Sequence, residues 1–145
     1  MFPRKQLDIG WADLAHAALY CSFPRSICAK EAELEGMFAS PFPVLSAFTV
    51  RTGFDLCLGA LGLQAGSEIL MSALTIKEMV NIARHHGLVP IPLDIESGTM
   101  APEIAKIEAA ITERTRAIVM AHLFGTRMPM GPVIELAKKH GLLVI

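Results

Sequence analysis

Several residue patterns that mark familiar protein classes are missing from this sequence. The three cysteines, Cys21, Cys28 and Cys57, form no CxxC pair and leave one thiol over, so neither a disulfide framework nor a cysteine-based zinc site is indicated. We expect buried free thiols and no bound metal. Thirteen basic residues stand against fourteen acidic ones, without a run of either sign, which argues against a nucleic-acid partner.

Apolar residues make up 52% of the sequence, yet no segment has the pattern of a membrane span. The longest charge-free run, residues 36–50, contains Pro41 and Pro43, whereas a spanning helix needs about 20 consecutive apolar residues. Arg4 and Lys5 are not followed by the long apolar stretch of a secretory signal. We therefore predict no membrane partner and a cytoplasmic location.

Common nucleotide-binding and hydrolase motifs are also absent. No GxxxxGK(S/T) segment is present, and the glycine-rich residues 59–66 come at the end of an expected helix instead of opening one. This argues against a P-loop and against a GxGxxG dinucleotide site. No Ser-His-Asp or Cys-His arrangement has a supporting motif. A small molecule or a protein is therefore the expected partner.

From residue 46 onward, short apolar or β-branched runs alternate with amphipathic helical segments. This alternation is typical of βαβ units and a mostly parallel sheet, so the expected fold class is α/β. The expected strands cover residues 46–50, 68–71, 88–93 and 116–121, and the expected helices cover residues 52–61, 75–86, 101–111 and 131–140. Residues 1–45 differ, because four prolines surround two short helical segments near residues 11–20 and 29–38. We interpret them as an N-terminal arm.

An internal repeat supports this order of elements. Residues 82–91 closely match residues 136–145, and in each copy a glycine, Gly87 or Gly141, separates the end of a helix from the start of a strand. The second copy has no continuation, so we expect a last strand that is cut short. Thr75, with Glu78 three residues later, predicts a capping box at the start of the second helix.

The turn between the first expected strand and the helix that follows it is a possible phosphate site. A helix N-terminus offers free N–H groups, and the Arg51 guanidinium and the Thr52 hydroxyl can hold a phosphate there. The alternative is an ordinary helix cap beside a solvated arginine, which spacing alone favours. His122 follows the fourth expected strand, and we expect its side chain to be satisfied within that connection.

Three blocks carry a resemblance to a known family. Residues 60–70 (ALGLQAGSEIL), 87–94 (GLVPIPLD) and 111–125 (ITERTRAIVMAHLFG) are similar, in this order, to ALG(I/L)xxGDEV(I/L), GaxPvfvDid and ITxrTkAIixvHlyG. These are blocks of the DegT/DnrJ/EryC1/StrS sugar aminotransferases, which use pyridoxal phosphate on the fold-type-I scaffold. The resemblance implies that residues 46–145 form the βαβαβα first half of that family's large domain, truncated at the last strand.

The resemblance also implies cofactor-binding residues. The turn that grips the cofactor phosphate in the family falls on Val50, Arg51 and Thr52, with Val50 in the place of a glycine. The family places an aromatic residue after the threonine that opens the next helix, where it stacks on the pyridine ring. Here that position holds Ile76, which can pack against the ring but offers no aromatic stacking. The implied cofactor-binding residues are therefore Arg51, Thr52 and Ile76.

Two further family residues have no counterpart in this sequence. An Asp that pairs with the pyridine nitrogen follows the strand matching residues 142–145 in the family, and the Schiff-base Lys comes much later. We therefore expect no catalytic residue here and no transamination by this chain alone, while pyridoxal 5'-phosphate is implied for the complete family member.

Two hypotheses follow for the function. The first is an N-terminal portion of a homodimeric aminotransferase, which moves an amino group from an amino-acid donor, typically glutamate or glutamine, to a keto-sugar or related ketone. The second is a non-enzymatic fragment or a protein-interaction module. An unfinished strand and uncovered helix faces would expose apolar surface and unpaired backbone groups to a partner.

Overall fold

The computed structural model describes residues 9–23, 27–38, 40–123 and 127–145. Phe124 and Gly125, which end the third family-like block, lie outside the described residues. The chain divides into two units, Met1–Ser46 and Ala47–Ile145, which are described separately.

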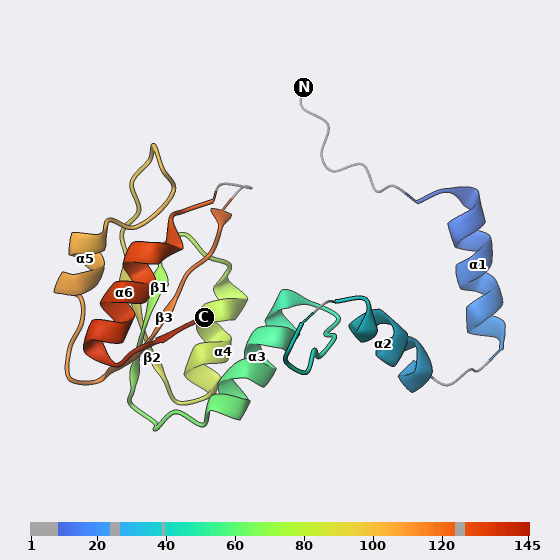
Figure 1. Ribbon diagram of the computed structural model, residues 1–145, viewed down its shortest axis with the longest axis horizontal. Coiled ribbons are helices and arrows are strands. Elements are labelled where there is room, and N and C mark those ends of the chain that lie inside the picture. Colours follow the sequence, from blue (N-terminus) through green and yellow to red (C-terminus); the bar gives the residue numbers. More distant parts are fainter. Residues whose placement is uncertain (1–8, 24–26, 39, 124–126) are drawn as a thin grey trace. The chain divides into compact units, whose positions relative to one another are not determined.

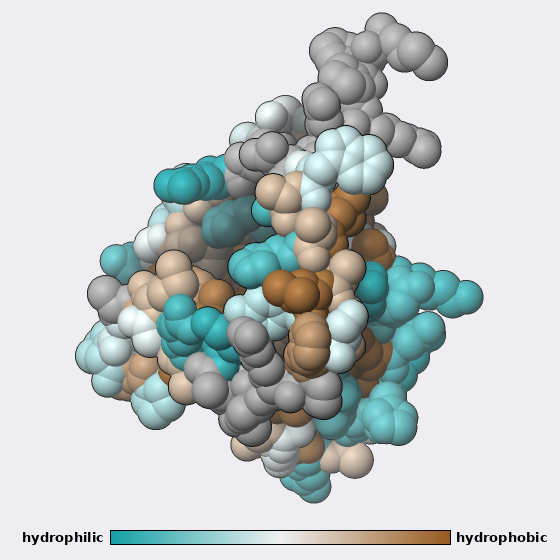
Figure 2. All heavy atoms as spheres, turned by 90° about the vertical axis from the view of Figure 1, so that its right-hand side faces the viewer, coloured by the Kyte–Doolittle hydropathy of each residue, from teal (hydrophilic) through white to brown (hydrophobic). Residues whose placement is uncertain are grey.

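The first unit contains helices α1 (Trp11–Ser22) and α2 (Ile27–Gly36) (Figure 1). They lie close to the two helical segments that the sequence predicts. The Gly10 N–H donates to the Asp13 carboxylate at 2.8 Å, which satisfies a backbone group where α1 begins. No residue of α1 is buried, and Trp11 is 87% exposed. Apolar side chains, in brown, reach the surface on the face drawn in Figure 2.

The second unit is built on a wholly parallel four-stranded sheet with the strand order β2-β1-β3-β4. Its sheet confirms the α/β class expected from the sequence. Along the chain the elements are α3 (Val50–Leu61), β1 (Glu68–Ser72), α4 (Lys77–His85), β2 (Val89–Leu93), α5 (Ile104–Ala109), β3 (Thr115–Val119), α6 (Met130–His140) and β4 (Leu143–Val144).

Helices cover both faces of this sheet, as Figure 1 shows. Successive side chains of a strand point to opposite faces, so β1 supplies Ile69 and Met71 to one core and Leu70 to the other. The first core also receives Phe54 and Leu58 from α3. The second core receives residues from α5 and α6, including Ile107, Val133 and Leu136. All five residues of β1 are buried, as expected for a central strand.

The internal repeat has the same local structure in both copies. Gly87 and Gly141 have φ values of 73° and 66°, a left-handed conformation that favours glycine. In the first copy the N–H of Leu88 donates to the Ala83 carbonyl at 3.0 Å, and in the second the N–H of Leu142 donates to the Ala137 carbonyl at 2.8 Å. The repeat therefore predicted both helix ends, and β4 follows the second one as expected.

The first strand expected from the sequence, residues 46–50, is wrong. Thr49 has an extended backbone, but α3 already begins at Val50. Within the described residues, no strand lies beside residues 46–49 to accept or donate ladder hydrogen bonds. An isolated extended segment cannot pair its backbone N–H and C=O groups as a strand in a sheet does. Val50 therefore begins a helix instead of ending a strand.

The capping box expected at Thr75 and Glu78 is also wrong. The N-cap of α4 is Ile76, which has an extended backbone and no side-chain cap. The helix therefore begins later than expected, so that Thr75 lies outside its first turn. α5 is likewise shorter than residues 101–111, because Glu103 is still extended at its N-cap.

The expectations from composition had mixed outcomes. Cys21 is exposed and Cys57 is half-buried, so the expected burial of these free thiols is wrong. In the ranges that the structure describes, no helix has the length and apolar character needed to cross a membrane.

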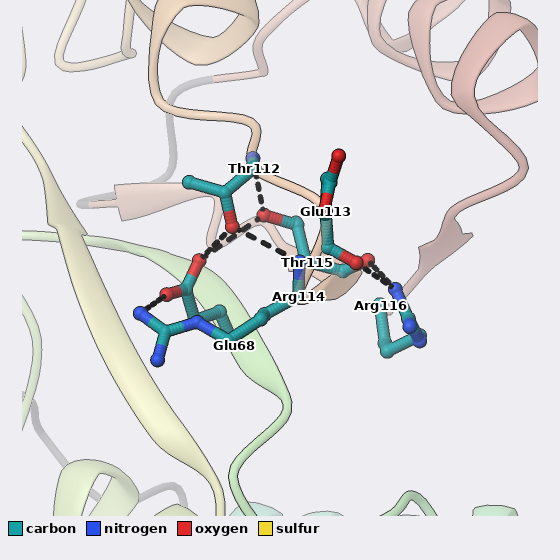
Figure 3. A network of polar contacts seen from close by, with 6 residues as sticks. All are labelled: Glu68, Thr112, Glu113, Arg114, Thr115 and Arg116. Atoms are coloured by element: carbon teal, nitrogen blue, oxygen red, sulfur yellow. Dashed lines mark hydrogen bonds and ion pairs between the residues drawn. The ribbon is translucent and has the colours of Figure 1, made fainter.

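A buried carboxylate joins the starts of β1 and β3. Glu68 is only 2% exposed. Its Oε1 accepts a hydrogen bond from Arg114 Nη2 at 2.5 Å, and its Oε2 accepts one from the Thr112 hydroxyl at 2.5 Å. The Thr115 hydroxyl lies at 3.5 Å on the same oxygen. Figure 3 shows the three donors converging on this carboxylate.

A change of register allows this arrangement. Glu68 pairs with Thr115, but the next residue, Ile69, pairs with Ala117, so Arg116 is an extra residue on β3. Arg116 Nη1 donates to the carbonyls of Glu113 and Thr115, each at 2.8 Å. The side chain of the extra residue thereby binds carbonyls next to the irregular step in the ladder (Figure 3).

The environment of Glu68 favours its ionised form. The hydrogen bond from Thr112 lowers the pKa of the Glu68 carboxyl, and Arg114 lowers it further. Burial acts in the opposite direction by disfavouring the charge, but the net shift of the pKa is downward.

The first prediction concerns the pH dependence of stability. Because the folded-state pKa of Glu68 lies below its ordinary value of 4.5, the carboxylate stabilises the fold above that pH. This contribution is lost as the pH falls through the folded-state pKa. We expect Glu68→Gln to lower the free energy of unfolding at neutral pH and to have a smaller effect in acid, as measured by urea denaturation. Glu113→Gln, at an exposed position, is the control, and an equal loss at both pH values would contradict the prediction.

Candidate functional site

The order of the strands identifies one edge of the sheet as the place for a ligand. From β1 the chain crosses to β2 on one side, whereas β3 and β4 lie on the other side. In open parallel sheets, ligands bind outside the carboxyl ends of the strands at such a change of direction. Here those ends are Ser72 of β1 and Val119 of β3.

Ser72 has an unusual environment at this edge. It is 5% exposed, and its hydroxyl is the one buried side-chain polar atom without a hydrogen-bond partner among the described residues. Burial of an unpaired hydroxyl costs about 1–3 kcal/mol. The carboxyl end of the central strand therefore retains an unsatisfied polar group.

The first turn of α3 contains the phosphate-binding residues expected from the sequence. Its cap is Thr49, which the sequence did not identify: the Thr49 hydroxyl accepts the N–H of Thr52 at 3.1 Å. The two threonine hydroxyls also lie 3.1 Å apart. The N–H groups of Val50 and Arg51 precede the first intrahelical hydrogen bond, so they are available to an acceptor outside the helix.

Arg51 and Thr52 line an open hollow between α3 and α4. Its volume is about 500 Å³. The remaining lining residues are Asp55 from α3 and Asn81, Ile82 and His85 from α4. The structure therefore brings Arg51 and Thr52 together on one wall, with side chains of a second helix on the other.

A hydrogen bond between the two helices lies next to the hollow. His86 Nε2 and Asp55 Oδ1 are 2.8 Å apart. Asp55 supplies the hollow with a negative charge, and this contact gives the carboxylate a partner at the C-cap of α4. The guanidinium of Arg51 has no hydrogen-bond partner within the described part of the chain. The hollow thus presents the Arg51 guanidinium and neutral donors, which suit an anionic group, beside one carboxylate, that of Asp55.

The other residues singled out from the sequence lie elsewhere. Ile76 is 48% exposed at the N-cap of α4 and does not line the hollow. Its expected packing against the pyridine ring stays a prediction. His122 Nδ1 accepts the N–H of Met128 at 3.4 Å, so its side chain is satisfied within its own connection, as expected. No group of side chains suited to a metal ion occurs among the residues described.

Sequence reasoning did not identify the α4 wall of the hollow. Asn81 and His85 are one helical turn apart and so share a face, a spacing that the sequence does contain. Nothing in the sequence indicates, however, that this face lies opposite the first turn of α3. That placement results from the packing of both helices on the same core.

The fold matches part of a known enzyme class. The chain superposes on the E. coli GDP-4-keto-6-deoxy-D-mannose-3-dehydratase, whose structure contains bound hydrated pyridoxal phosphate, with a TM-score of 0.82 and 17% identity. The match covers 99% of this chain and 40% of that one. The architecture is that of fold-type-I pyridoxal-phosphate aminotransferases, matched over a fraction of their length.

The sequence comparison assigns the family. A family model matches residues 27–145, and the chain belongs to the DegT/DnrJ/EryC1/StrS aminotransferase family. GDP-perosamine synthase of Caulobacter vibrioides is 36% identical over 116 residues, covering 78% of this chain and 31% of the relative. The dTDP-4-dehydro-2,6-dideoxy-D-glucose 3-dehydratase of Saccharopolyspora spinosa is 39% identical over 122 residues, covering 77% and 26%. The chain thus spans about a third or less of the length of these relatives.

The second prediction concerns Ser72. Ser72→Ala removes the unpaired hydroxyl and leaves the packing of the strand intact, so we expect the free energy of unfolding to rise by about 1 kcal/mol. Urea denaturation measures the change, with Ser97→Ala as a control at an exposed serine. A clear loss of stability in Ser72→Ala would show that the hydroxyl has a partner in the folded protein.

Proposed function

We propose that this chain forms the part of a pyridoxal-phosphate-dependent sugar aminotransferase that holds the cofactor phosphate. The observation that carries the proposal is the hollow at the first turn of α3, where Arg51 and Thr52 lie together as the family resemblance implies. Family membership supplies the cofactor class.

The residues of the hollow fit a phosphate group. Arg51 provides an unpaired guanidinium, Thr52 provides a hydroxyl, and the N–H groups of Val50 and Arg51 lie at the positive end of α3. A volume of about 500 Å³ leaves room for more than the phosphate. Val50 is 79% exposed, so its side chain is not packed against the core at this turn.

Each of these groups has a defined task in the proposed site. Arg51 binds and neutralises the phosphate, Thr52 donates a hydrogen bond from its hydroxyl, and Thr49 fixes the turn through the N–H of Thr52. When bound, pyridoxal phosphate supplies an electron sink for chemistry at the amino-bearing carbon. We assign no residue of this chain to proton transfer.

For the complete protein we propose transfer of an amino group from an amino-acid donor to a keto-sugar carried on a nucleoside diphosphate. The relatives support this substrate class, because their names specify GDP- and dTDP-linked sugars. A sugar 3-dehydratase is the second candidate, favoured by the Saccharopolyspora relative. Both reactions use the same proposed phosphate site.

We further propose that the chain associates with a second copy of itself. The exposed apolar side chains of the first unit support this, among them Trp11, Phe23 and Phe42, since exposed apolar surface favours association.

The third prediction tests the phosphate site. Arg51→Ala combined with Thr52→Ala removes a charge-assisted hydrogen bond, worth about 1.5–3 kcal/mol, together with a neutral one. We expect at least about tenfold weaker binding of pyridoxal phosphate to the full chain, measured by fluorescence titration. Binding of pyridoxal, which has no phosphate, should not change.

Arg84→Ala is the matched control, because Arg84 is an exposed helical arginine that does not line the hollow. Equal affinity of the double variant and the unchanged chain for pyridoxal phosphate would disprove the proposed site.

The fourth prediction concerns association. Light scattering after size-exclusion chromatography should give a mass of twice the 15.7 kDa of one chain, increasingly so at higher protein concentration. A mass of one chain at every concentration would contradict self-association.

A further inference from the structure

The α4 wall of the hollow contains polar side chains that the proposed function has not used. Asn81 and His85 lie on one face of α4, one turn apart, opposite Arg51 and Thr52. The Asn81 carboxamide has no hydrogen-bond partner within the described residues. Within the same part of the chain, the one contact of the His85 side chain is with the ring of His86, with centroids 5.9 Å apart. Both side chains are exposed to the hollow and able to donate to a ligand.

The hollow contains one cation and one carboxylate. Arg51 is an unpaired cation, while the carboxylate of Asp55 is hydrogen-bonded to His86 at 2.8 Å. The same contact joins α3 to the C-cap residue of α4. Asn81 adds donors without adding charge, and it lines the same hollow as Arg51 and Thr52.

We propose that Asn81 is a further phosphate-binding residue, whose side-chain N–H donates to an oxygen of the phosphate held by Arg51 and Thr52. His85 provides a second donor from the same wall. The phosphate is then held between two helices and not by the N-terminus of α3 alone. This inference rests on the proposed function, because it places a further residue in the same site.

The fifth prediction tests Asn81 in the full chain with pyridoxal phosphate and, separately, inorganic phosphate as probes. Asn81→Ala should weaken the binding of both by at least about tenfold, as expected for one hydrogen bond to a charged group. Asn81→Asp should weaken binding further, because a carboxylate repels the phosphate. Asn81→Gln, which keeps the amide, should recover part of the affinity. Glu78→Gln, at an exposed position of α4 outside the hollow, should bind like the unchanged chain.

The pattern of results separates the possible failures. Affinity unchanged in Asn81→Ala and Asn81→Asp but reduced in the Arg51 and Thr52 double variant would overturn the role of Asn81 and leave the proposed function standing. Affinity unchanged in all of these variants would overturn both the role of Asn81 and the proposed phosphate site. Equal weakening in the Ala, Asp and Gln variants, with pyridoxal weakened as much as pyridoxal phosphate, would show that Asn81 only maintains the helix packing, and would also overturn the inference.

Discussion

The buried Glu68 carboxylate fixes how the two central strands meet. Three donors from the segment before and at the start of β3 converge on it, and without them the buried carboxylate would be an unpaired charge. A shift of one residue between strands moves every side chain to the opposite face. Directly after Glu68 and Thr115 the register changes, because Ile69 pairs with Ala117 and not with Arg116. This offset decides which residues of β1 and β3 enter each of the two cores, and so where the covering helices can pack.

The parts of the fold that could be predicted are those that local sequence determines. Gly87 and Gly141 needed only a left-handed conformation after a helix, and both copies of the repeat have it. The strand predicted at residues 46–50 is wrong because a strand needs a neighbouring strand, which the local sequence does not specify. The cap predicted at Thr75 is wrong for a smaller reason. Several residues near the start of a helix can be its N-cap, and in α4 this residue is Ile76.

The candidate site, too, could be predicted only in part from the sequence. The position of Arg51 and Thr52 at a helix start could be expected from a resemblance in sequence, and the structure places both on one hollow. The same resemblance places Ile76 against the pyridine ring of the cofactor, and Ile76 lies outside that hollow. Asn81 could not be anticipated, because its importance depends on how α3 packs against α4, and the Asp55–His86 contact that joins these helices spans 31 residues of sequence.

The two ends of the sheet differ in how firmly they are held. At the amino ends of β1 and β3, the Glu68 carboxylate accepts from Thr112, Arg114 and Thr115. At the carboxyl end of β1, the Ser72 hydroxyl is buried without a partner among the residues that the structure describes. Local opening is least costly where few interactions are lost. Motion of this sheet should therefore concentrate at its carboxyl edge, so that the loops there can adapt to a ligand while the strand register, set at the opposite edge, does not change.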